Sequence, residues 1–283
     1  MMFSKSLVSL PIPEAGKVIK NLGFEGVDLT VRPGGHVQPE EVMRALPEAV
    51  RILKDLGLAV PLLTTSITRA SDPAAKDILE SAGKLGTREI KLGYWPYKGF
   101  GHYSEGLDAM ARDLDGIENL ARNTGVRANL HTHSGNYMTA VPFAIWQLIK
   151  DRDPKAIGAY LDPGHMTLEW SQSGWKMGLD LLSSRLSVLA IKDIALSPSE
   201  PGGTRSGASR VRSRPILVPL GEGLVPWEEV MVCLRQIGFK GWASVHSEYQ
   251  EGYSWKSLTV PEIIEQTRAD MAYLQRVGKD VLS

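Results

Sequence analysis

Short apolar runs alternate along this chain with longer amphipathic stretches. The runs expected as strands lie at about residues 5–10, 26–31, 58–64, 88–93, 126–132, 157–162, 187–193 and 242–247. The amphipathic stretches expected as helices lie at about residues 13–22, 39–55, 73–84, 105–123, 141–151, 173–184, 226–237 and 261–277. Strands that alternate with helices of this length are typical of βαβ units and of a parallel sheet.

A glycine follows many of the predicted helices, a few residues before the next strand. The glycines in this position are Gly23, Gly57, Gly86, Gly125 and Gly238. Glycine adopts the left-handed conformation of a helix C-cap without steric cost. Eight strand–helix pairs without a break in composition predict a closed (β/α)8 TIM barrel, a single α/β domain over residues 1–283. The competing fold is an open doubly wound sheet, but no G-x-G-x-x-G follows the first predicted strand.

Four of the predicted strands end in residues that can bind metals or transfer protons. The four segments are 128–133, 159–165, 189–193 and 243–248, and they hold four of the six histidines. The carboxyl ends of barrel strands meet at one mouth, where TIM barrels carry their chemistry. Residues two apart on a strand share a face, so His131 and His133 point the same way, as do His246 and Glu248. This convergence predicts an active site.

Several motifs in the same regions resemble those of a known family. They are LGFEGVDL at 22–29, LDPGH at 161–165, IKD at 191–193, VPLGEGLVPW at 218–227 and SVHSEY at 244–249. With them the chain resembles the xylose isomerase-like barrels of the sugar phosphate isomerase/epimerase superfamily. That group includes tagatose-type ketose 3-epimerases, inosose dehydratases and apurinic endonucleases. The resemblance implies a TIM barrel along nearly the whole chain, whereas the superfamily hosts several chemistries.

The resemblance also implies a ligand pattern from which this chain departs. Epimerases of the family hold one divalent metal on Glu, Asp, His and Glu at the ends of strands 5 to 8, and the two glutamates exchange the proton beside the carbonyl. Asp162 matches the strand-6 ligand, and His165 matches a histidine that touches substrate. The other three ligand positions fall on His131, Ala190 and His246. Only one of the four family ligands is therefore kept.

A metal site built from this chain would use His131, Asp162 and His246, with Glu248 as an alternative ligand. Imidazole and carboxylate suit one divalent ion such as Mn²⁺, Co²⁺, Zn²⁺ or Mg²⁺, and water would complete the coordination. Alternatively, the ammonium group of Lys192 could occupy the position of the ion's charge. The two readings differ because a lysine beside a metal ion is electrostatically costly unless it is neutral or paired.

Three residues are candidates for catalysis: His133, Lys192 and Glu248. Histidine titrates near neutrality, so His133 is expected to act as a base, with His131 and His246 as alternatives. Lys192 could polarise a substrate oxygen, or it could pair structurally with the adjacent Asp193. Together these groups suit proton transfer next to a carbonyl.

Four residues are candidates for substrate contact: Arg32, His36, Trp95 and His165. Arg32 and His36 follow the second predicted strand, and Trp95 lies in the aromatic segment 94–103, which could form a wall against a sugar face. Inside the barrel, Asp28 and Lys91 are expected to form a structural pair. The long segment 197–215 is expected to be a lid or a disordered surface loop, and its arginines could hold a phosphate; they are Arg205, Arg210, Arg212 and Arg214.

Composition excludes several other classes of protein. Net charge is zero, so no overall field recruits nucleic acid or an anionic membrane, and no apolar run reaches the ~20 residues of a membrane span. No Walker or G-x-S-x-G motif occurs, and no nucleotide cofactor is expected. The lone Cys233 excludes a disulfide framework. Residues 1–13 make a poor secretory signal, so a cytoplasmic location is expected unless a leader was removed.

The sequence therefore predicts an isomerase or epimerase that acts on a small sugar, keto-sugar or polyol. One alternative is a lyase or dehydratase acting on a keto-sugar, which needs only one base and one electrophile. Another is a catalytically silent carbohydrate-binding barrel. The expected partner is the small-molecule carbohydrate itself, with no nucleic acid and no membrane. Barrels that resemble this one often form homo-oligomers, although no interface is identifiable in the sequence.

Overall fold

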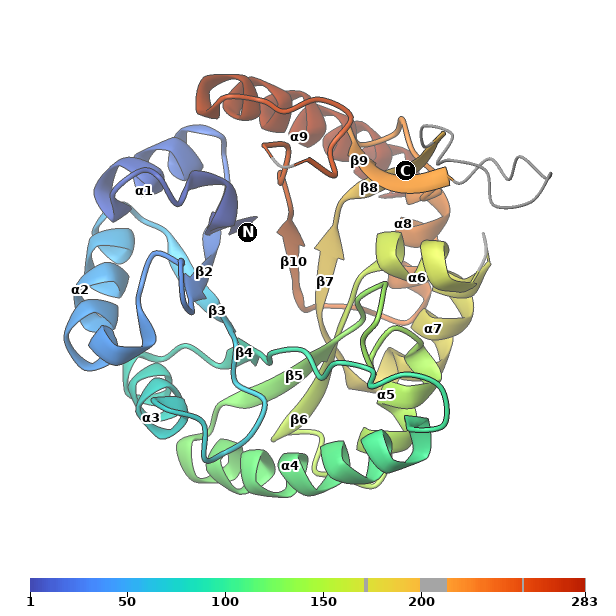
Figure 1. Cartoon of the computed structure of the whole chain (residues 1–283). Coiled ribbons are helices and arrows are strands. Elements are labelled where there is room, and N and C mark those ends of the chain that lie inside the picture. The colour runs from blue at the N-terminus through green and yellow to red at the C-terminus, as the bar shows by residue number, and fades with distance from the viewer. Residues whose placement is uncertain (171–172, 199–212, 251, 283) are drawn as a thin grey trace, which may run out of the picture.

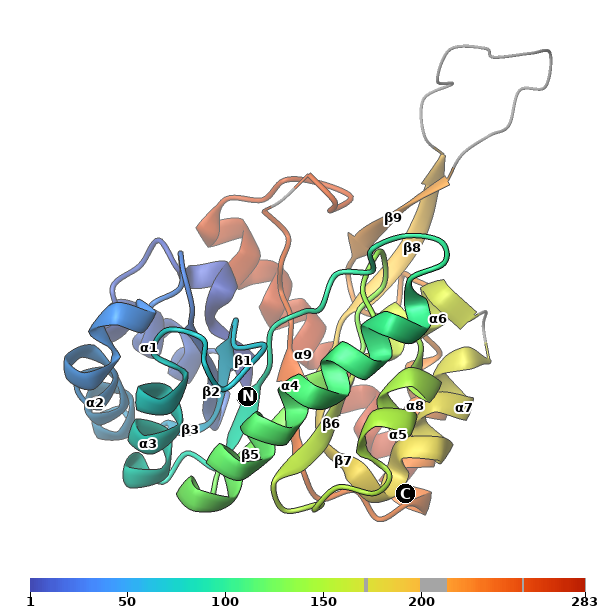
Figure 2. The same ribbon diagram turned by 60° about the horizontal axis from the view of Figure 1, so that its bottom comes forward.

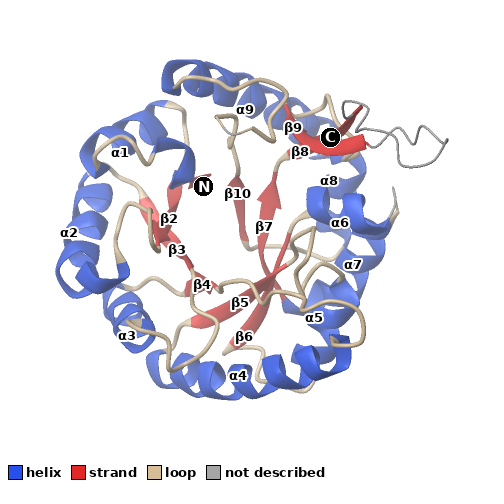
Figure 3. Cartoon of the chain, in the orientation of Figure 1, coloured by secondary structure: helices blue, strands red, loops and turns tan. Residues whose placement is uncertain are grey.

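Eight parallel strands close into a barrel in the computed structural model of the chain, with helices around the outside (Figures 1 and 3). The structure describes residues 1–283 except 171–172, 199–212, 251 and 283. The barrel strands are β1 (Met2–Phe3), β2 (Gly26–Val31), β3 (Ala59–Thr65), β4 (Glu89–Lys91), β5 (Arg127–His131), β6 (Ile157–Leu161), β7 (Leu186–Ile191) and β10 (Trp242–Val245). Around the barrel they follow the order β1-β10-β7-β6-β5-β4-β3-β2, so the TIM-barrel prediction is confirmed.

The helices of the described residues pack their apolar faces on the outside of the barrel. The α-helices are α1 (Ile12–Asn21), α2 (Val42–Asp55), α3 (Ala75–Leu85), α4 (Tyr103–Thr124), α5 (Pro142–Ile149), α6 (Pro163–Trp170), α7 (Gly174–Leu182), α8 (Trp227–Gln236) and α9 (Val260–Leu282). The 3-10 helices are η1 (Ser4–Leu7), η2 (Pro39–Glu41) and η3 (Ser183–Arg185). None of these helices is long and apolar enough to cross a membrane.

Two apolar layers hold the barrel together. The larger one lies between strands and helices and contains outward-facing strand residues such as Leu29, Leu63 and Leu130. The smaller one fills the barrel interior, where Leu62 and Tyr160 are part of a separate buried cluster. Because side chains alternate between the two faces of a strand, the inward positions run upward from this cluster to the polar groups at the mouth.

The first strand lies earlier in the chain than the sequence indicates. Residues 5–10 alternate like a strand, but β1 is Met2–Phe3, and Ser4–Leu7 form η1. Met2 pairs with Val27 on one side and with Val245 on the other, which closes the barrel. The hydroxyl of Ser4 then accepts a hydrogen bond from the amide of Thr30 at 3.0 Å, in place of a continuing ladder. The prediction of a strand at 5–10 is therefore wrong, and Lys5 stands on a helical turn at the mouth.

The segment directly after β6 is a helix, whereas the sequence pattern places the next helix only at 173–184. Pro163 opens α6, where its fixed φ is well suited, and Asp162 precedes it. The Oδ1 atom of Asp162 accepts a hydrogen bond from the amide of His165 at 3.0 Å, as a helix-capping carboxylate does. This cap leaves Oδ2 of Asp162 directed to the mouth and carries His165 beside it.

A hairpin extends from the barrel beyond β7. Strand β8 (Asp193–Pro198) pairs antiparallel with β9 (Ser213–Val218), and Figure 2 shows the pair projecting past the mouth. Both oxygens of Asp193 accept backbone amides at its base, including those of Gly221 and Val225. The expected long loop is therefore strand at both ends. Its proposed lid, with Arg205, Arg210 and Arg212, lies outside the described residues.

Candidate active site

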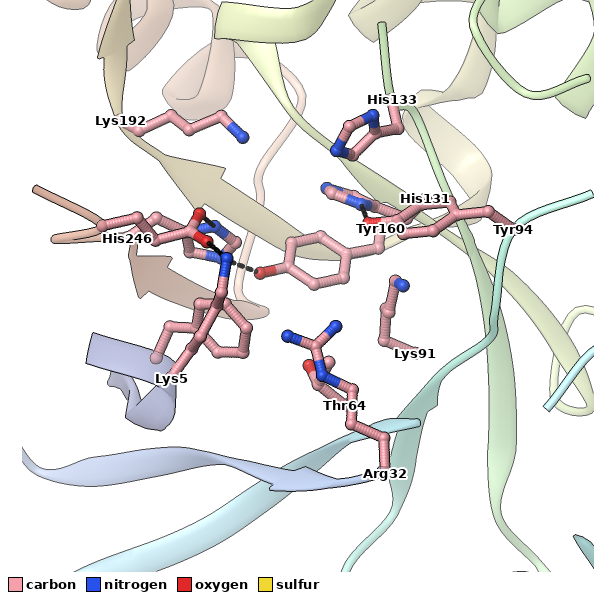
Figure 4. Close-up of a pocket in the computed structure, with 12 residues that line it drawn as sticks. Lys5, Arg32, Thr64, Lys91, Tyr94, His131, His133, Tyr160, Lys192 and His246 are labelled. Atoms are coloured by element: carbon pink, nitrogen blue, oxygen red, sulfur yellow. Dashed lines mark hydrogen bonds and ion pairs between the residues drawn. The ribbon is translucent and has the colours of Figure 1, made fainter. Parts of the chain in front are cut away.

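A cavity of about 150 Å³ opens at the carboxyl ends of the barrel strands (Figure 4). The residues that line it are Phe3, Lys5, Arg32, Thr64, Lys91, Tyr94, His131, His133, Tyr160, Lys192, His246 and Glu248. A second cavity of about 310 Å³ adjoins it beneath the β8–β9 hairpin. The two cavities share Lys5, His133, Lys192 and Glu248. The outer cavity adds apolar side chains of the hairpin, such as Ile216.

The centre of the site is an ion pair between Lys192 and Asp162. The two side chains are 5% and 0% exposed, and Nζ of Lys192 lies 2.8 Å from Oδ2 of Asp162. Lys192 also donates a hydrogen bond to Nε2 of His165 at 2.6 Å. Because Nε2 of His165 accepts, its Nδ1 carries the proton and donates to the hydroxyl of Ser134 at 2.8 Å. Lys192 therefore pairs with Asp162, and the predicted alternative partner Asp193 binds backbone amides instead.

The charges around this pair favour an ionised Asp162 and a neutral His165. Burial alone would raise the pKa of Asp162, but the positive charge of Lys192, with His165 and His131 nearby, holds it well below its usual value. Burial and the same lysine lower the pKa of His165 well below that of a free histidine. A single buried ammonium–carboxylate pair thus sits at the bottom of the mouth, with neutral imidazoles around it.

Glu248 anchors the other side of the site, after β10. Its Oε1 accepts a hydrogen bond from Nζ of Lys5 at 2.7 Å, and its Oε2 lies 3.4 Å from Nδ1 of His246. The hydroxyl of Tyr160 lies 2.7 Å from Nε2 of His246, so a proton on Nδ1 of His246 would face Glu248. Burial would raise the pKa of Glu248, but His246, Lys5 and Lys192 together lower it well below its usual value. Glu248 is a carboxylate at neutral pH.

His133 reaches the cavity from the strand end of β5. Its Nδ1 lies 2.9 Å from the carbonyl oxygen of Ser134, which can only accept, so Nδ1 carries the proton and Nε2 keeps its lone pair. Burial, and then the charge of Lys192, lower the pKa of His133 to about 4. Below it, His131 faces the hydroxyl of Tyr94 at 3.0 Å and the carboxylate of Asp162 at 3.5 Å. His133 is therefore neutral at pH 7, with one nitrogen able to accept a proton.

Tyr160 links this site to the barrel interior. Besides His246, its hydroxyl lies 3.4 Å from Oδ2 of Asp28, which also accepts hydrogen bonds from Ser244 at 2.9 Å and, at Oδ1, from Thr64 at 2.6 Å. The partners of the Asp28 carboxylate are therefore hydroxyl groups, and no ion pair between Asp28 and Lys91 occurs within the described residues. The predicted pair is replaced by this network.

Replacing Tyr160 by phenylalanine tests the network. The change removes one hydroxyl and leaves Nε2 of His246 without its partner in a buried site, so the free energy of unfolding should fall by about 1–3 kcal/mol. Urea denaturation of Tyr160→Phe measures it. The matched control is Tyr103→Phe, which removes the same hydroxyl group at the start of α4, where it contacts only the carbonyl oxygen of Met138 among the hydrogen bonds described. Tyr253→Phe does not serve as a control, because Tyr253 contacts Glu248 in the site. An unchanged free energy of unfolding in Tyr160→Phe would show that the hydroxyl is not needed.

The predicted metal ligands converge, but a lysine occupies their centre. His131, Asp162 and His246 all reach the same mouth, yet no three metal-binding side chains in the described part of the chain are arranged to hold an ion. Oδ2 of Asp162, the oxygen that a cation would use, has no well-directed hydrogen bond but carries the 2.8 Å ion pair with Lys192. A divalent ion there would lie against a buried ammonium group. In this arrangement the residues do not fit a divalent ion.

The structure brings most of the predicted site residues together. The candidate catalytic residues His133, Lys192 and Glu248 line both cavities, Arg32 lines the inner one, and His165 lines the outer one. His36 and Trp95 are not among the residues that line them. His36 lies on Leu7 and Thr30, with Nε2 at 3.2 Å from the carbonyl of Leu7, and Trp95 donates to Asp113 at 2.9 Å. Their contact with substrate stays a prediction.

Five residues of the inner cavity are not predicted from the sequence: Phe3, Lys5, Thr64, Tyr94 and Tyr160. The pattern predicts Lys5 on a strand, whereas the structure has it on η1. Thr64 and Tyr160 occupy inward strand positions, so their two-residue spacing from other inward residues is a signal that could have found them. Tyr94 begins the aromatic segment 94–103, and it lines the cavity, whereas Trp95 packs in the core.

Comparisons with known proteins agree with this architecture. The sequence profile of the xylose isomerase-like TIM barrel family matches residues 17–277. A structure described as D-psicose 3-epimerase in the presence of D-fructose is 16% identical, with a TM-score of 0.70 and 98% of each chain covered. D-psicose 3-epimerase from Clostridium cellulolyticum H10 with D-tagatose is 15% identical, with a TM-score of 0.69 and coverage of 94% of this chain and 93% of that one. The probable 3-DHS dehydratase AsbF from Bacillus anthracis is 17% identical, with a TM-score of 0.66 and 97% of each chain covered. No curated protein matches the sequence.

Proposed function

Because the chain belongs to the xylose isomerase-like TIM barrel family, we propose that it is a sugar isomerase or epimerase. It would act on a small sugar, keto-sugar or polyol by moving a proton next to a carbonyl. Structures of the same fold include enzymes described as epimerases of D-psicose and L-ribulose, which supports this chemistry. A cytoplasmic location and a role in carbohydrate metabolism belong to the same proposal.

One observation carries the proposal: Glu248 and His133, two proton acceptors, line a single cavity at the barrel mouth with the ammonium group of Lys192 between them. Glu248 follows β10 and His133 follows β5, which lie three places apart around the eight-stranded barrel, with β7 and β6 between them. Lys192, at the end of β7, reaches into the cavity between the two. A substrate seated there meets a proton-transfer group on each side and a positive charge at its centre.

In the proposed reaction, Lys192 donates a hydrogen bond to the carbonyl oxygen of the substrate. This stabilises the negative charge that develops when the adjacent carbon loses its proton. The Glu248 carboxylate takes that proton. For isomerisation, Glu248 returns it to the neighbouring carbon. For epimerisation, His133 takes up a proton from solvent at Nε2 and delivers it to the same carbon from the opposite face, and Glu248 then releases its own proton to solvent. Asp162 keeps Lys192 charged and positioned.

A lyase is the second candidate, and the Lys192–Glu248 arrangement favours it specifically. Elimination from a keto-sugar needs one base beside the carbonyl and one group that stabilises the enolate, and these two residues supply both without His133. Product mass separates the two candidates.

Deuterium exchange tests the proposal directly. The protein should be incubated in D₂O with a panel of ketohexoses, ketopentoses and keto-acids, and the products followed by mass spectrometry and NMR. Isomerisation or epimerisation adds deuterium without losing a fragment, whereas elimination loses water. Sugars that bind without exchange, across the whole panel, would indicate a carbohydrate-binding barrel without turnover and contradict the proposal.

A further inference from the structure

The inner cavity holds more positive charge than its carboxylates neutralise. Four permanently or readily charged side chains line it, and two of them have carboxylate partners: Lys5 pairs with Glu248, and Lys192 pairs with Asp162. Within the part of the chain that the structure describes, the other two, Arg32 and Lys91, form no ion pair with a carboxylate. The excess charge is therefore confined to these two residues.

Lys91 is the more unusual of the two because it is almost completely buried. At the end of β4 it is 2% exposed, and its Nζ lies 3.5 Å from the centre of the Tyr94 ring, its one contact of this kind. Asp28, a buried carboxylate whose charge acts on Lys91, already accepts hydrogen bonds from Thr64 and Ser244. Burial, and then the charge of Arg32, lower the pKa of Lys91 well below its usual value. The fold therefore holds a lysine amine whose charged form the protein alone stabilises poorly.

Arg32 faces the same space from the end of β2. Its guanidinium lies 5.9 Å from the centre of the Phe3 ring, and Figure 4 shows it entering the cavity beside Lys91. Lys192 and His133 enter from the opposite side in the same view. The charged form of Lys91 beside the half-buried Arg32, with no carboxylate partner for either among the described residues, is costly, since buried charges are normally paired. An oxyanion between Arg32 and Lys91 would remove this cost and make charge-assisted hydrogen bonds to both.

We propose that Arg32 and Lys91 form a subsite for an anionic group of the substrate, which is therefore an acidic sugar rather than a neutral one. The inference rests on the proposed function, because the carbonyl end of the same substrate would lie against Lys192 and Glu248. The planar fork of Arg32 fits both oxygens of a carboxylate and two oxygens of a phosphate. The shared chemistry is an oxyanion, supplied by a sugar acid or by a sugar phosphate.

Binding of three related sugars tests the subsite: D-fructose, 5-keto-D-gluconate and D-fructose 6-phosphate. Isothermal titration calorimetry should show that the wild-type protein binds at least one of the two anions about 10- to 100-fold more tightly than fructose. Lys91→Met and Arg32→Gln should each lose about that factor for the anion and change fructose binding little. The control Lys17→Met, which removes an exposed lysine on α1, should bind all three as the wild type does.

Thermal unfolding separates a ligand subsite from a structural role. If Lys91 stabilises the fold, Lys91→Met should lower Tm. If Lys91 instead serves to bind the anion, the substitution removes an unpaired buried charge, and Tm should stay equal or rise. Tight binding of the keto-acid alone assigns a carboxylate, and tight binding of the ester alone assigns a phosphate. The subsite is refuted if fructose binds as tightly as both anions, if neither anion binds, or if Lys91→Met binds the preferred anion unchanged.

The two proposals fail in different ways. Deuterium exchange into a neutral keto-sugar, with no preference for an anion, would leave the enzyme proposal standing and refute the subsite. Anion binding that depends on Lys91 and Arg32, without exchange into any bound sugar, would support the subsite and refute the enzyme proposal.

Discussion

Replacing Lys192 by methionine is expected to lower the free energy of unfolding by about 3–5 kcal/mol, the range seen when one partner of a buried ion pair is removed. The reason is that Asp162 is completely buried and its Oδ2 depends on the ammonium group 2.8 Å away. His165 would also lose the donor to its Nε2. Methionine keeps the length of the side chain, so the loss reports charge rather than volume. Urea denaturation at pH 7 measures it.

A double-mutant cycle with Asp162→Asn isolates the pair. Asparagine is neutral, so Lys192→Met should cost much less when Asp162→Asn is already present, and the coupling should exceed about 1 kcal/mol. Lys176→Met is the matched control, because Lys176 pairs with Glu229 on the exposed surface and such pairs contribute about 0–1 kcal/mol. Additive effects of the two buried substitutions would mean that the pair is not formed as described.

Substitution of Lys192 also tests whether its ammonium group is what keeps the predicted metal ligands from binding a divalent ion. With Lys192→Ala, the carboxylate of Asp162 would face the imidazoles of His131 and His165 with no competing ammonium group. This variant is expected to bind Zn²⁺ more tightly than the wild type in a calorimetric titration. Equal or tighter Zn²⁺ binding by the wild-type protein would show that Lys192 gives way to an ion.

The barrel was predictable because its signals are local and repeated. Each predicted helix is amphipathic, many end at a glycine, and the next apolar run follows within a few residues, so seven of the eight strands fall where the pattern places them. The first strand was not predictable in this way. Met2 pairs with Val27 and Val245, and Phe3 pairs with Asp28, all far away in the sequence. The alternating run that follows begins with η1 instead of a strand.

The sequence predicts on which face of a strand each site residue lies, but not which other side chain it contacts. Two-residue spacing predicts that His131, His246 and Lys192 face one mouth, and the structure has all three lining the inner cavity. Which groups touch depends on side-chain length and on backbone turns that no spacing encodes. Lys192 can reach Asp162 because α6 begins at Pro163 and its cap directs one oxygen of Asp162 to the helix and the other to the mouth.

Glu248→Gln is expected to reduce kcat/KM by about 10²–10⁴-fold for the sugar identified by deuterium exchange, because an amide cannot accept the substrate proton. Glutamine keeps the size of the side chain and a hydrogen-bond acceptor for Lys5, so KM should change little and most of the loss should appear in kcat. Deuterium wash-in should fall in proportion. Glu14→Gln, on the exposed face of α1, is the matched control.

The pH profile of the wild-type enzyme tests the same assignment. The folded-state pKa of Glu248 is held well below its usual 4.5, so its carboxylate persists as pH falls through 4.5 and is lost only at lower pH. An acid limb of kcat/KM governed by Glu248 must therefore lie below 4.5 and be absent in Glu248→Gln. A loss of less than tenfold in that variant would exclude Glu248 as the base. Because His133 is the other acceptor at the cavity, full retention with a matching loss in His133→Gln would transfer the role to it.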